Sequence, residues 1–287
     1  MNDTLTRLKI YMNMGTLAEL PEWSSWPGLE GREALQFLQE AGFDGVQDGD
    51  PELCRDLGMG CAGSGRVDQP GEAEPLARRL IDQGYESATL HVGRGFETDA
   101  EMDALARAII TAVGETGFPL MVETHRATMT QDPFRTIALL QRNPGLMING
   151  DFSHYYTGLE LVYGDFAGKL DRMQPIFDKV RFMHGRIGNP SHIQVDIGDG
   201  TEPVQQEHGH SHFLADYREM WKRAMQGFLD NADPAATLVF APEILAPSIY
   251  YARLFRQSDG SLWEESDRYQ QALVYAGIAR EVFASLS

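Results

Sequence analysis

Residues that bind divalent cations follow four consecutive apolar segments in the second half of the chain. The four are Glu123, Asp151, His184 and Glu243, each at or just beyond the end of an apolar run. Three carboxylates and one imidazole form an oxygen-rich ligand set that suits Mn, Mg or Co, with Zn also possible. Four protein ligands leave coordination positions open for substrate oxygens, as a metal enzyme requires. Each residue alone could be a turn or a helix cap, but the recurrence favours a metal site.

Short apolar runs alternate with longer amphipathic stretches along the chain. We expect strands at 8–12, 45–47, 59–62, 87–92, 118–122, 146–148, 180–183 and 237–241. We expect helices at 32–41, 73–83, 100–116, 133–141, 159–178, 213–231 and 264–287. Asp132 is the expected cap of the fourth helix, with Pro133 in its first turn. This alternation is typical of parallel strands joined by right-handed crossovers.

Eight strand–helix repeats predict an α/β protein with a (β/α)8 TIM barrel that forms one domain over residues 1–287. A doubly wound open sheet is the alternative, but no Gly-x-Gly-x-x-Gly follows the first strand. In a barrel the C-terminal ends of the strands meet at one mouth, so the four ligand-type side chains would converge there. Segments 15–29 and 185–212 are longer than connectors need to be, which favours a functional role.

Two local motifs around these residues carry a family resemblance. Asp151-Phe152-Ser153-His154 resembles an Asp-x-x-His motif, and His184-Gly185-Arg186 resembles a His-x-(Arg or Asp) motif. With Glu123 and Glu243, they resemble the xylose isomerase-like TIM-barrel superfamily of sugar phosphate isomerases and epimerases. That superfamily also includes hydroxypyruvate isomerases, inosose dehydratases and the endonuclease IV (AP endonuclease family 2) branch. The resemblance implies Glu123, Asp151, His184 and Glu243 as metal ligands, and His154 and Arg186 as substrate-binding or ligand-supporting residues.

The activity implied by this resemblance is that of a metal-dependent isomerase or epimerase acting on a small keto sugar or sugar phosphate through a metal-stabilised enediolate. Removing a proton next to a carbonyl requires stabilisation of the resulting charge, which a cation supplies. Glu123 and Glu243 are the expected catalytic pair, one on each face of the substrate, and the sequence leaves open which of them is the base. The alternatives are an inosose dehydratase-like lyase, an endonuclease IV-like nuclease and a catalytically degenerate sugar-binding relative.

Further side chains near the strand ends are candidates for substrate binding. His91 follows the fourth strand, His125 comes two residues after Glu123, and Trp26 can stack on the apolar face of a sugar. Arg186 can bind an anionic group through its planar guanidinium. The second strand departs from the family pattern, because it ends in Gln47-Asp48 where many relatives place a glutamate.

Two other features have weaker chemical interpretations. The tract of His208, His210 and His212 is expected to be a solvated loop, with a second metal site as the alternative. Cys54 and Cys61 are expected to be buried free thiols, because two cysteines are too few for a disulfide scaffold.

The charge balance restricts the classes of partner. The 287 residues carry 24 basic and 42 acidic side chains, a formal net charge of -18. Such a surface repels nucleic acid and anionic membranes on average, so a small-molecule sugar or sugar phosphate is the expected partner. No apolar stretch is long enough to span a bilayer, and the N-terminus lacks the pattern of a secretory signal, which predicts a cytoplasmic protein. A homo-oligomer is possible, since barrels of this kind commonly pair.

Overall fold

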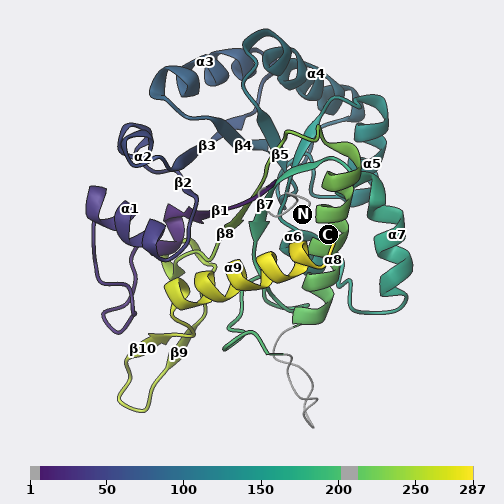
Figure 1. The fold of residues 1–287 in the computed structure, drawn as a ribbon. Coiled ribbons are helices and arrows are strands. Elements are labelled where there is room, and N and C mark those ends of the chain that lie inside the picture. Colours follow the sequence, from purple (N-terminus) through teal and green to yellow (C-terminus); the bar gives the residue numbers. More distant parts are fainter. Residues whose placement is uncertain (1–6, 202–212, 287) are drawn as a thin grey trace.

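Eight parallel strands close into a barrel in the computed structural model, which describes residues 7–201 and 213–286. The strands are β1 (Leu8–Asn13), β2 (Gly45–Gln47), β3 (Gly60–Val67), β4 (Ser87–Val92), β5 (Leu120–Glu123), β6 (Met147–Gly150), β7 (Val180–Gly185) and β8 (Leu238–Pro242). Each strand pairs with its neighbours in chain order, and β1 also pairs with β8 (Figure 1). The predicted (β/α)8 barrel is confirmed. The open-sheet alternative is wrong, because the strand order never reverses.

Helices surround the barrel, as Figure 1 shows. The α-helices are α1 (Gly31–Glu40), α2 (Pro51–Leu57), α3 (Ala73–Gln83), α4 (Asp99–Thr116), α5 (Pro133–Arg142), α6 (Ser153–Gly158), α7 (Phe166–Phe177), α8 (Leu214–Asn231) and α9 (Arg268–Ala284). Three short 3-10 helices are η2 (Met14–Leu17), η3 (Pro70–Glu72) and η4 (Pro247–Ile249). The Asp132 carboxylate accepts a hydrogen bond from the Arg135 amide, which confirms the predicted cap of α5.

The structure departs from the predicted elements at several places. The expected helix over 159–178 begins only at Phe166, because Glu160 and Gly164 adopt positive φ and Asp165 caps α7, and the preceding helix α6 was not predicted. The last helix begins at Arg268 rather than 264, since Asp267 caps it. Between β8 and α9 the chain forms an antiparallel hairpin of β9 (Leu254–Arg256) and β10 (Leu262–Glu264), which was not predicted. The short helix α2 between β2 and β3 was not predicted either.

The core lies mainly between the strands and the helices. Trp221 of α8 is fully buried and packs edge-on against Phe240 of β8 and Tyr275 of α9. A smaller apolar cluster fills the barrel interior, formed by Tyr11, Ala62, Met121, Phe182, Val239 and Ala241. Tyr11 leaves no room for a neighbour's side chain, because a Cβ at Gly60 would lie 1.7 Å from its hydroxyl oxygen. The barrel wall therefore needs glycine at this position of β3.

Strand register sets which residues reach the mouth at the same height. Asn13 pairs with Gln47 at the ends of β1 and β2, and Glu123 pairs with Asn149 between β5 and β6. His184 of β7 pairs with Ala241 of β8, two residues before Glu243. Polar side chains from all round the barrel thus meet in one layer at the C-terminal end, which is where barrel enzymes carry their sites.

Several remaining expectations can be compared with the structure. Cys54 and Cys61 are buried free thiols, as predicted. Within the described residues, none of the helices combines the length and the apolar character that crossing a membrane would require. The tract of His208, His210 and His212 lies outside the described residues.

Candidate metal centre

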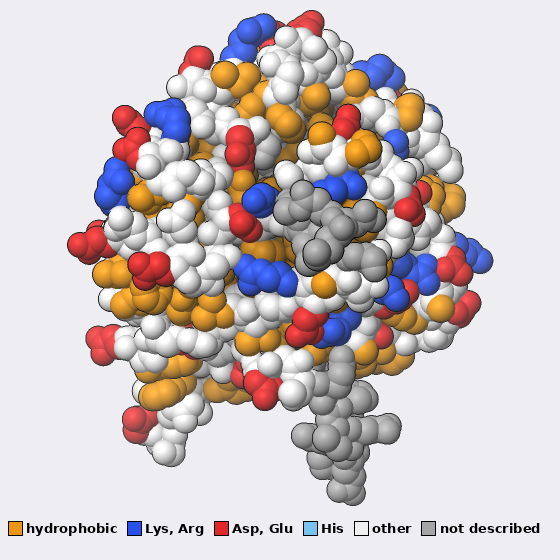
Figure 2. Space-filling view, in the orientation of Figure 1, with side chains coloured by type: hydrophobic (Ala, Val, Ile, Leu, Met, Phe, Trp, Pro, Cys, Tyr) orange, Lys and Arg blue, Asp and Glu red, His pale blue; other side chains and the backbone are white. Residues whose placement is uncertain are grey.

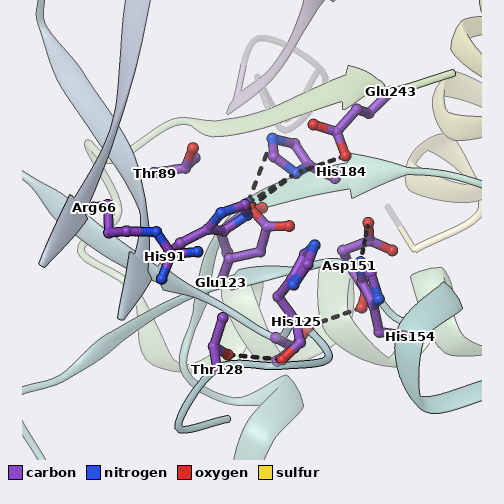
Figure 3. Close-up of polar contacts among 12 residues, drawn as sticks. Arg66, Thr89, His91, Glu123, His125, Thr128, Asp151, His154, His184 and Glu243 are labelled. Atoms are coloured by element: carbon purple, nitrogen blue, oxygen red, sulfur yellow. Dashed lines mark hydrogen bonds and ion pairs between the residues drawn. The ribbon is translucent and has the colours of Figure 1, made fainter. Parts of the chain in front are cut away.

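The four ligand-type side chains meet at the barrel mouth. Glu123 ends β5, Asp151 follows β6, His184 lies in β7 and Glu243 follows β8. One ligand atom from each of the four lies within 4.8 Å of the ligand atoms of the other three. Figure 3 shows the side chains pointing toward one another from their separate strands. The convergence expected from the strand ends is therefore present in the fold, at a spacing that suits a shared cation.

His184 is at the centre of the cluster. Its Nδ1 lies 3.3 Å from Oε2 of Glu123 and 3.4 Å from Oε2 of Glu243. On the opposite side of the ring, Nε2 lies 2.9 Å from Oε1 of Gln47. An amide oxygen only accepts, so Gln47 places the proton on Nε2 and leaves Nδ1 as the ligand atom. Gln47 is itself oriented by donating to Thr89 Oγ1 at 2.9 Å.

The electrostatics of the cluster favour positive charge between the carboxylates. Burial opposes the charged form of His184, but the carboxylates of Glu243 and Glu123 outweigh burial and raise the pKa of His184 to about 9. Burial would raise the pKa of Glu123, but His184 and then His91 outweigh it and hold that pKa well below its ordinary value. Burial raises the pKa of Glu243. Positive charge between Glu123 and Glu243 can be supplied either by a proton on His184 or by a bound metal cation.

The donor set fits a divalent metal. Asp151 is fully buried, and its Oδ1 accepts hydrogen bonds from the Ser153 amide at 3.1 Å and from the Ser153 hydroxyl. Its Oδ2 is buried and accepts no hydrogen bond, and the same holds for Oδ1 of Asn149 beside Glu123. A buried oxygen that accepts no hydrogen bond costs free energy, which a bound cation would relieve. Glu123, Asp151, His184 and Glu243 are therefore the residues that would hold the ion.

This geometry can be compared with known proteins. No family model and no curated protein sequence matches the chain. Solved structures do match: a xylose isomerase-like TIM barrel protein from Mycobacterium smegmatis, in complex with magnesium, has a TM-score of 0.56 at 13% sequence identity over 100% of both chains. The chain has the fold of the xylose isomerase-like TIM barrels.

Two further structures with this fold carry different activities in their names. The probable 3-DHS dehydratase AsbF, involved in petrobactin synthesis in Bacillus anthracis, has a TM-score of 0.55 at 16% identity, over 94% of this chain and 97% of that chain. A D-tagatose 3-epimerase-like protein has a TM-score of 0.53 at 12% identity, over 97% of this chain and 98% of that chain. At these identities the likeness concerns the fold alone.

An open cavity of about 590 Å³ lies over the candidate metal ligands of this xylose isomerase-like barrel. It is lined by Asn13, Met14, Gly15, Gln47, Asp48, Ser64, Gly65, Arg66, Thr89, His91, Glu123, His184, Glu243 and Leu245. Polar residues of the first four strands give this cavity a wall rich in hydroxyl and amide groups. Most of these residues have no role predicted from the sequence, although Asn13 and Gln47 also stand at strand ends.

Three amides hold the carboxylates and the imidazole in place. Asn149 Nδ2 lies 3.2 Å from Glu123 Oε2 and 3.1 Å from His184 Nδ1. Asn13 Nδ2 donates to Glu243 Oε1 at 3.0 Å. Gln47 contacts His184 from the opposite side, so the Gln47-Asp48 departure from the family pattern places an amide, not a carboxylate, beside the cluster. The contacts of Asn13 and Gln47 are supporting hydrogen bonds of the kind that metal ligands need, whereas Asn149 Nδ2 lies against His184 Nδ1, the nitrogen that a cation would take.

A row of three imidazoles lies beside the cluster. The ring centroids of His91 and His125 are 4.3 Å apart, and those of His125 and His154 are 3.9 Å apart. Burial lowers the pKa of His125 to about 4 and lowers the pKa of His154 well below its ordinary value. Both ring nitrogens of His154 are buried without a hydrogen-bond partner. Two uncharged imidazoles therefore lie beside the cluster at neutral pH.

Arg186 connects the row with the metal cluster. Its guanidinium contacts the Glu243 carboxylate and lies 3.4 Å from Asp151 Oδ2. The same guanidinium lies 4.3 Å from the ring centre of Tyr251, whose hydroxyl is 3.3 Å from Nε2 of His125. Tyr251 lies in the loop between β8 and β9 and was not predicted. Because Tyr251 does not follow a predicted strand, the sequence pattern does not predict that it contacts His125 and Arg186.

Trp26 is not brought to the cavity. Its ring packs edge-on against Phe37 of α1 at 5.5 Å and against Tyr269 of α9 at 5.2 Å. Trp26 is not among the residues that line the cavity over the candidate ligands, and its stacking on a substrate stays a prediction. The Trp26 indole packs against the hydrophobic core beside α9.

Proposed function

We propose that this chain is a divalent-metal-dependent isomerase or epimerase that acts on a small keto sugar or sugar phosphate. One observation carries the proposal: ligand atoms of Glu123, Asp151, His184 and Glu243 lie within 4.8 Å of one another beneath an open polar cavity. When bound, the cation would act as a Lewis acid that polarises the substrate carbonyl and stabilises the charge left when the adjacent proton is removed.

Glu123 and Glu243 take the proton-transfer roles in this proposal. They approach from β5 and from the end of β8, so a substrate held between them presents a different carbon or face to each. Glu243 is the more accessible of the two, with a side chain 13% exposed against 3% for Glu123. Asn13 and Arg186 hold the Glu243 carboxylate, which favours it as the base that removes the first proton.

The imidazole row and Arg186 are proposed to bind the substrate. His91, His125 and His154 lie along one side of the cluster, where their ring nitrogens would meet substrate hydroxyl groups. Arg186 is already paired with two carboxylates, so it orients them and can donate a further hydrogen bond from Nη1, which has no hydrogen-bond partner, to an anionic oxygen.

A dehydratase-type lyase is the second candidate. It uses the same proton removal but expels a hydroxyl group, which needs a nearby proton donor or acceptor. We propose His154 for that role, because its ring nitrogens make no hydrogen bond and its Nε2 lies 3.5 Å from Asp151 Oδ2. The fold neighbours include both a D-tagatose 3-epimerase-like protein and a probable dehydratase, so both reaction types are proposed for this scaffold.

The test is a screen of ketoses, keto-inositols and their phosphates with Mn²⁺, read by mass spectrometry and by chromatography that resolves epimers. An unchanged mass with a new stereoisomer supports the isomerase proposal, and loss of one water supports the lyase. Glu243→Gln should lower turnover by roughly 100- to 10,000-fold. Glu281→Gln, on the exposed face of α9, is the matched control. Full activity in Glu243→Gln would rule out its catalytic assignment.

A further inference from the structure

Asp48 is an acidic residue of the cavity that the proposed reaction does not use. It follows β2 directly and lines the cavity together with Ser64 of β3 and Thr89 of β4. Among the described residues, it belongs to neither group whose ligand atoms lie close enough together to hold a metal. The residue is exposed where the cavity opens. Its carboxylate is therefore free to meet a substrate instead of the cation.

The backbone holds Asp48 in a conformation that few residues adopt. Its φ is 58°, in the left-handed region that glycine, asparagine and aspartate tolerate best. Its amide donates to the Ala62 carbonyl at 2.8 Å, and Gly49 continues the turn where a Cβ would lie 2.4 Å from Val46 Cγ2. Strained backbone of this kind persists where the surrounding structure enforces it, and it is concentrated at functional sites. The turn after β2 thus fixes the position from which Asp48 enters the cavity.

Ser64 orients the Asp48 carboxylate. Both the hydroxyl and the amide of Ser64 donate hydrogen bonds to it. Within the described part of the chain no arginine or lysine balances its charge, and the cationic group that acts on it is the His184 imidazole. A carboxylate has about four acceptor positions, so the two bonds from Ser64 leave positions for further donors.

Arg66, the arginine that lines the cavity, is already paired elsewhere. Its Nη1 donates to the Gly93 carbonyl at 2.9 Å and lies 3.2 Å from Asp68 Oδ1. Figure 3 shows Arg66 and Thr89 on the side of the cluster away from the carboxylate of Asp151, which is the side toward which the cavity extends. The charge of Arg66 is thus offset by Asp68, whereas the charge of Asp48 remains. An anionic group on the substrate would meet an uncompensated carboxylate there.

The outer surface does not provide the same discrimination. Figure 2 shows acidic and basic side chains interspersed over one face of the molecule, without a continuous area of either sign. At physiological ionic strength exposed charges are screened beyond about 8 Å. The groups inside the cavity therefore decide whether a charged substrate is accepted.

We propose that Asp48 is a specificity-determining residue that accepts hydrogen bonds from hydroxyl groups of the substrate chain and so selects an uncharged polyol ketone over its phosphate ester. Hydroxyl groups can donate to the carboxylate, whereas a phosphate dianion offers only acceptor oxygens and a like charge, which is repelled. The inference rests on the proposed function for the ketose itself and narrows the substrate class to the unphosphorylated form.

The test is isothermal titration calorimetry of the Mn²⁺-loaded protein with a hexitol and with the corresponding hexitol phosphate, neither of which is a substrate for turnover. The wild type should bind the hexitol more tightly. Asp48→Asn keeps the size of the side chain and its tolerance of positive φ but removes the charge. It should weaken hexitol binding about 10-fold, because hydrogen bonds to a charged acceptor are the stronger ones. The ratio of the phosphate to the hexitol dissociation constant should fall roughly 10- to 100-fold.

Asp82→Asn, at an exposed position of α3, is the matched control and should keep the wild-type ratio. Thermal unfolding and a Mn²⁺ titration establish that each variant is folded and loaded. A wild type that binds the hexitol phosphate more tightly would overturn the proposal, and so would a wild-type ratio in Asp48→Asn. If no ketose is converted while the ratio still falls in Asp48→Asn, the proposed reaction fails and the role of Asp48 in binding stands.

Discussion

Gln47 and His184 are joined by one hydrogen bond across the barrel mouth, between Gln47 Oε1 and His184 Nε2 at 2.9 Å. The two residues are 137 positions apart in the chain. The contact determines which ring nitrogen of His184 faces Glu123 and Glu243, and therefore whether the cluster offers a lone pair to a cation. It also links β2, which supplies no predicted ligand, with the candidate ligand His184 of β7.

Replacing Gln47 should weaken metal binding without unfolding the barrel. In Gln47→Leu the His184 ring loses the acceptor that fixes its tautomer, so the dissociation constant for Mn²⁺ should rise about 10- to 100-fold. Isothermal titration calorimetry measures this directly. Gln39→Leu is the matched control, because it makes the same change at an exposed position of α1, outside the cluster. An unchanged Mn²⁺ affinity in Gln47→Leu would show that the contact has no role in ligation.

Metal affinity should depend on pH through His184. Its pKa is raised to about 9 because, against the effect of burial, Glu243 and Glu123 stabilise the imidazolium. A metal needs the neutral ring, so binding displaces a proton below pH 9 and the affinity should rise about tenfold per pH unit toward that value. In the metal-free protein the raised pKa of His184 also contributes to stability against unfolding. This contribution is fully present below the unfolded-state pKa of about 6.5 and is lost as pH rises through 9.

Titrations with Mn²⁺ at pH 6.5, 7.5 and 8.5, with the buffer ionisation heats compared, measure the released proton. His184→Asn is the control, since it removes the titrating group from the cluster. A flat affinity over this range in the wild type would contradict a single displaced proton from His184.

Asp267 should stabilise the fold in a pH-dependent way. Burial would raise its pKa, but the Ser25 amide and the hydroxyl of Ser24 outweigh burial and lower it, and Asp267 also caps α9. A lowered pKa gives stability that is present above the unfolded value near 4 and lost as pH falls through the folded value. Asp267→Ala should therefore cost about 1 kcal/mol at pH 7 and less at pH 3.

Urea unfolding of Asp267→Ala at both pH values gives the two differences. Asp132→Ala is the comparison, because Asp132 caps α5 through the Arg135 amide alone. Equal losses for Asp267→Ala at pH 7 and pH 3 would exclude the contribution of ionised Asp267.

Gly60 should tolerate no side chain. A Cβ there would lie 1.7 Å from the Tyr11 hydroxyl and 2.7 Å from Glu86, so Gly60→Ala should destabilise by about 1–3 kcal/mol through overpacking. In Gly114→Ala of α4, where a Cβ meets nothing within 4 Å, the same change should stabilise by about 0.5–1 kcal/mol. Thermal unfolding of the two variants compares them, and a neutral Gly60→Ala would show that Tyr11 can move aside.

The strand–helix order and the four ligand-type residues are predictable from the sequence. Apolar runs are local signals, and the residue that follows a run is at a strand end wherever the strand pairs. The barrel mouth then brings Glu123, Asp151, His184 and Glu243 together, because parallel strands share one C-terminal edge. The same reasoning failed for the segment before α9, where short strands with little periodicity formed a hairpin.

The surroundings of those four residues depend on contacts between distant parts of the chain. Asn13, Gln47 and Asn149 gained their contacts from strand register, and Tyr251 reached His125 from a loop without periodicity. Trp26 was assigned to the substrate by its chemistry, yet its loop packed it on α9. A residue type limits which bonds a side chain can form, but distances between chain segments decide which it does form, and those distances follow from packing over the whole barrel.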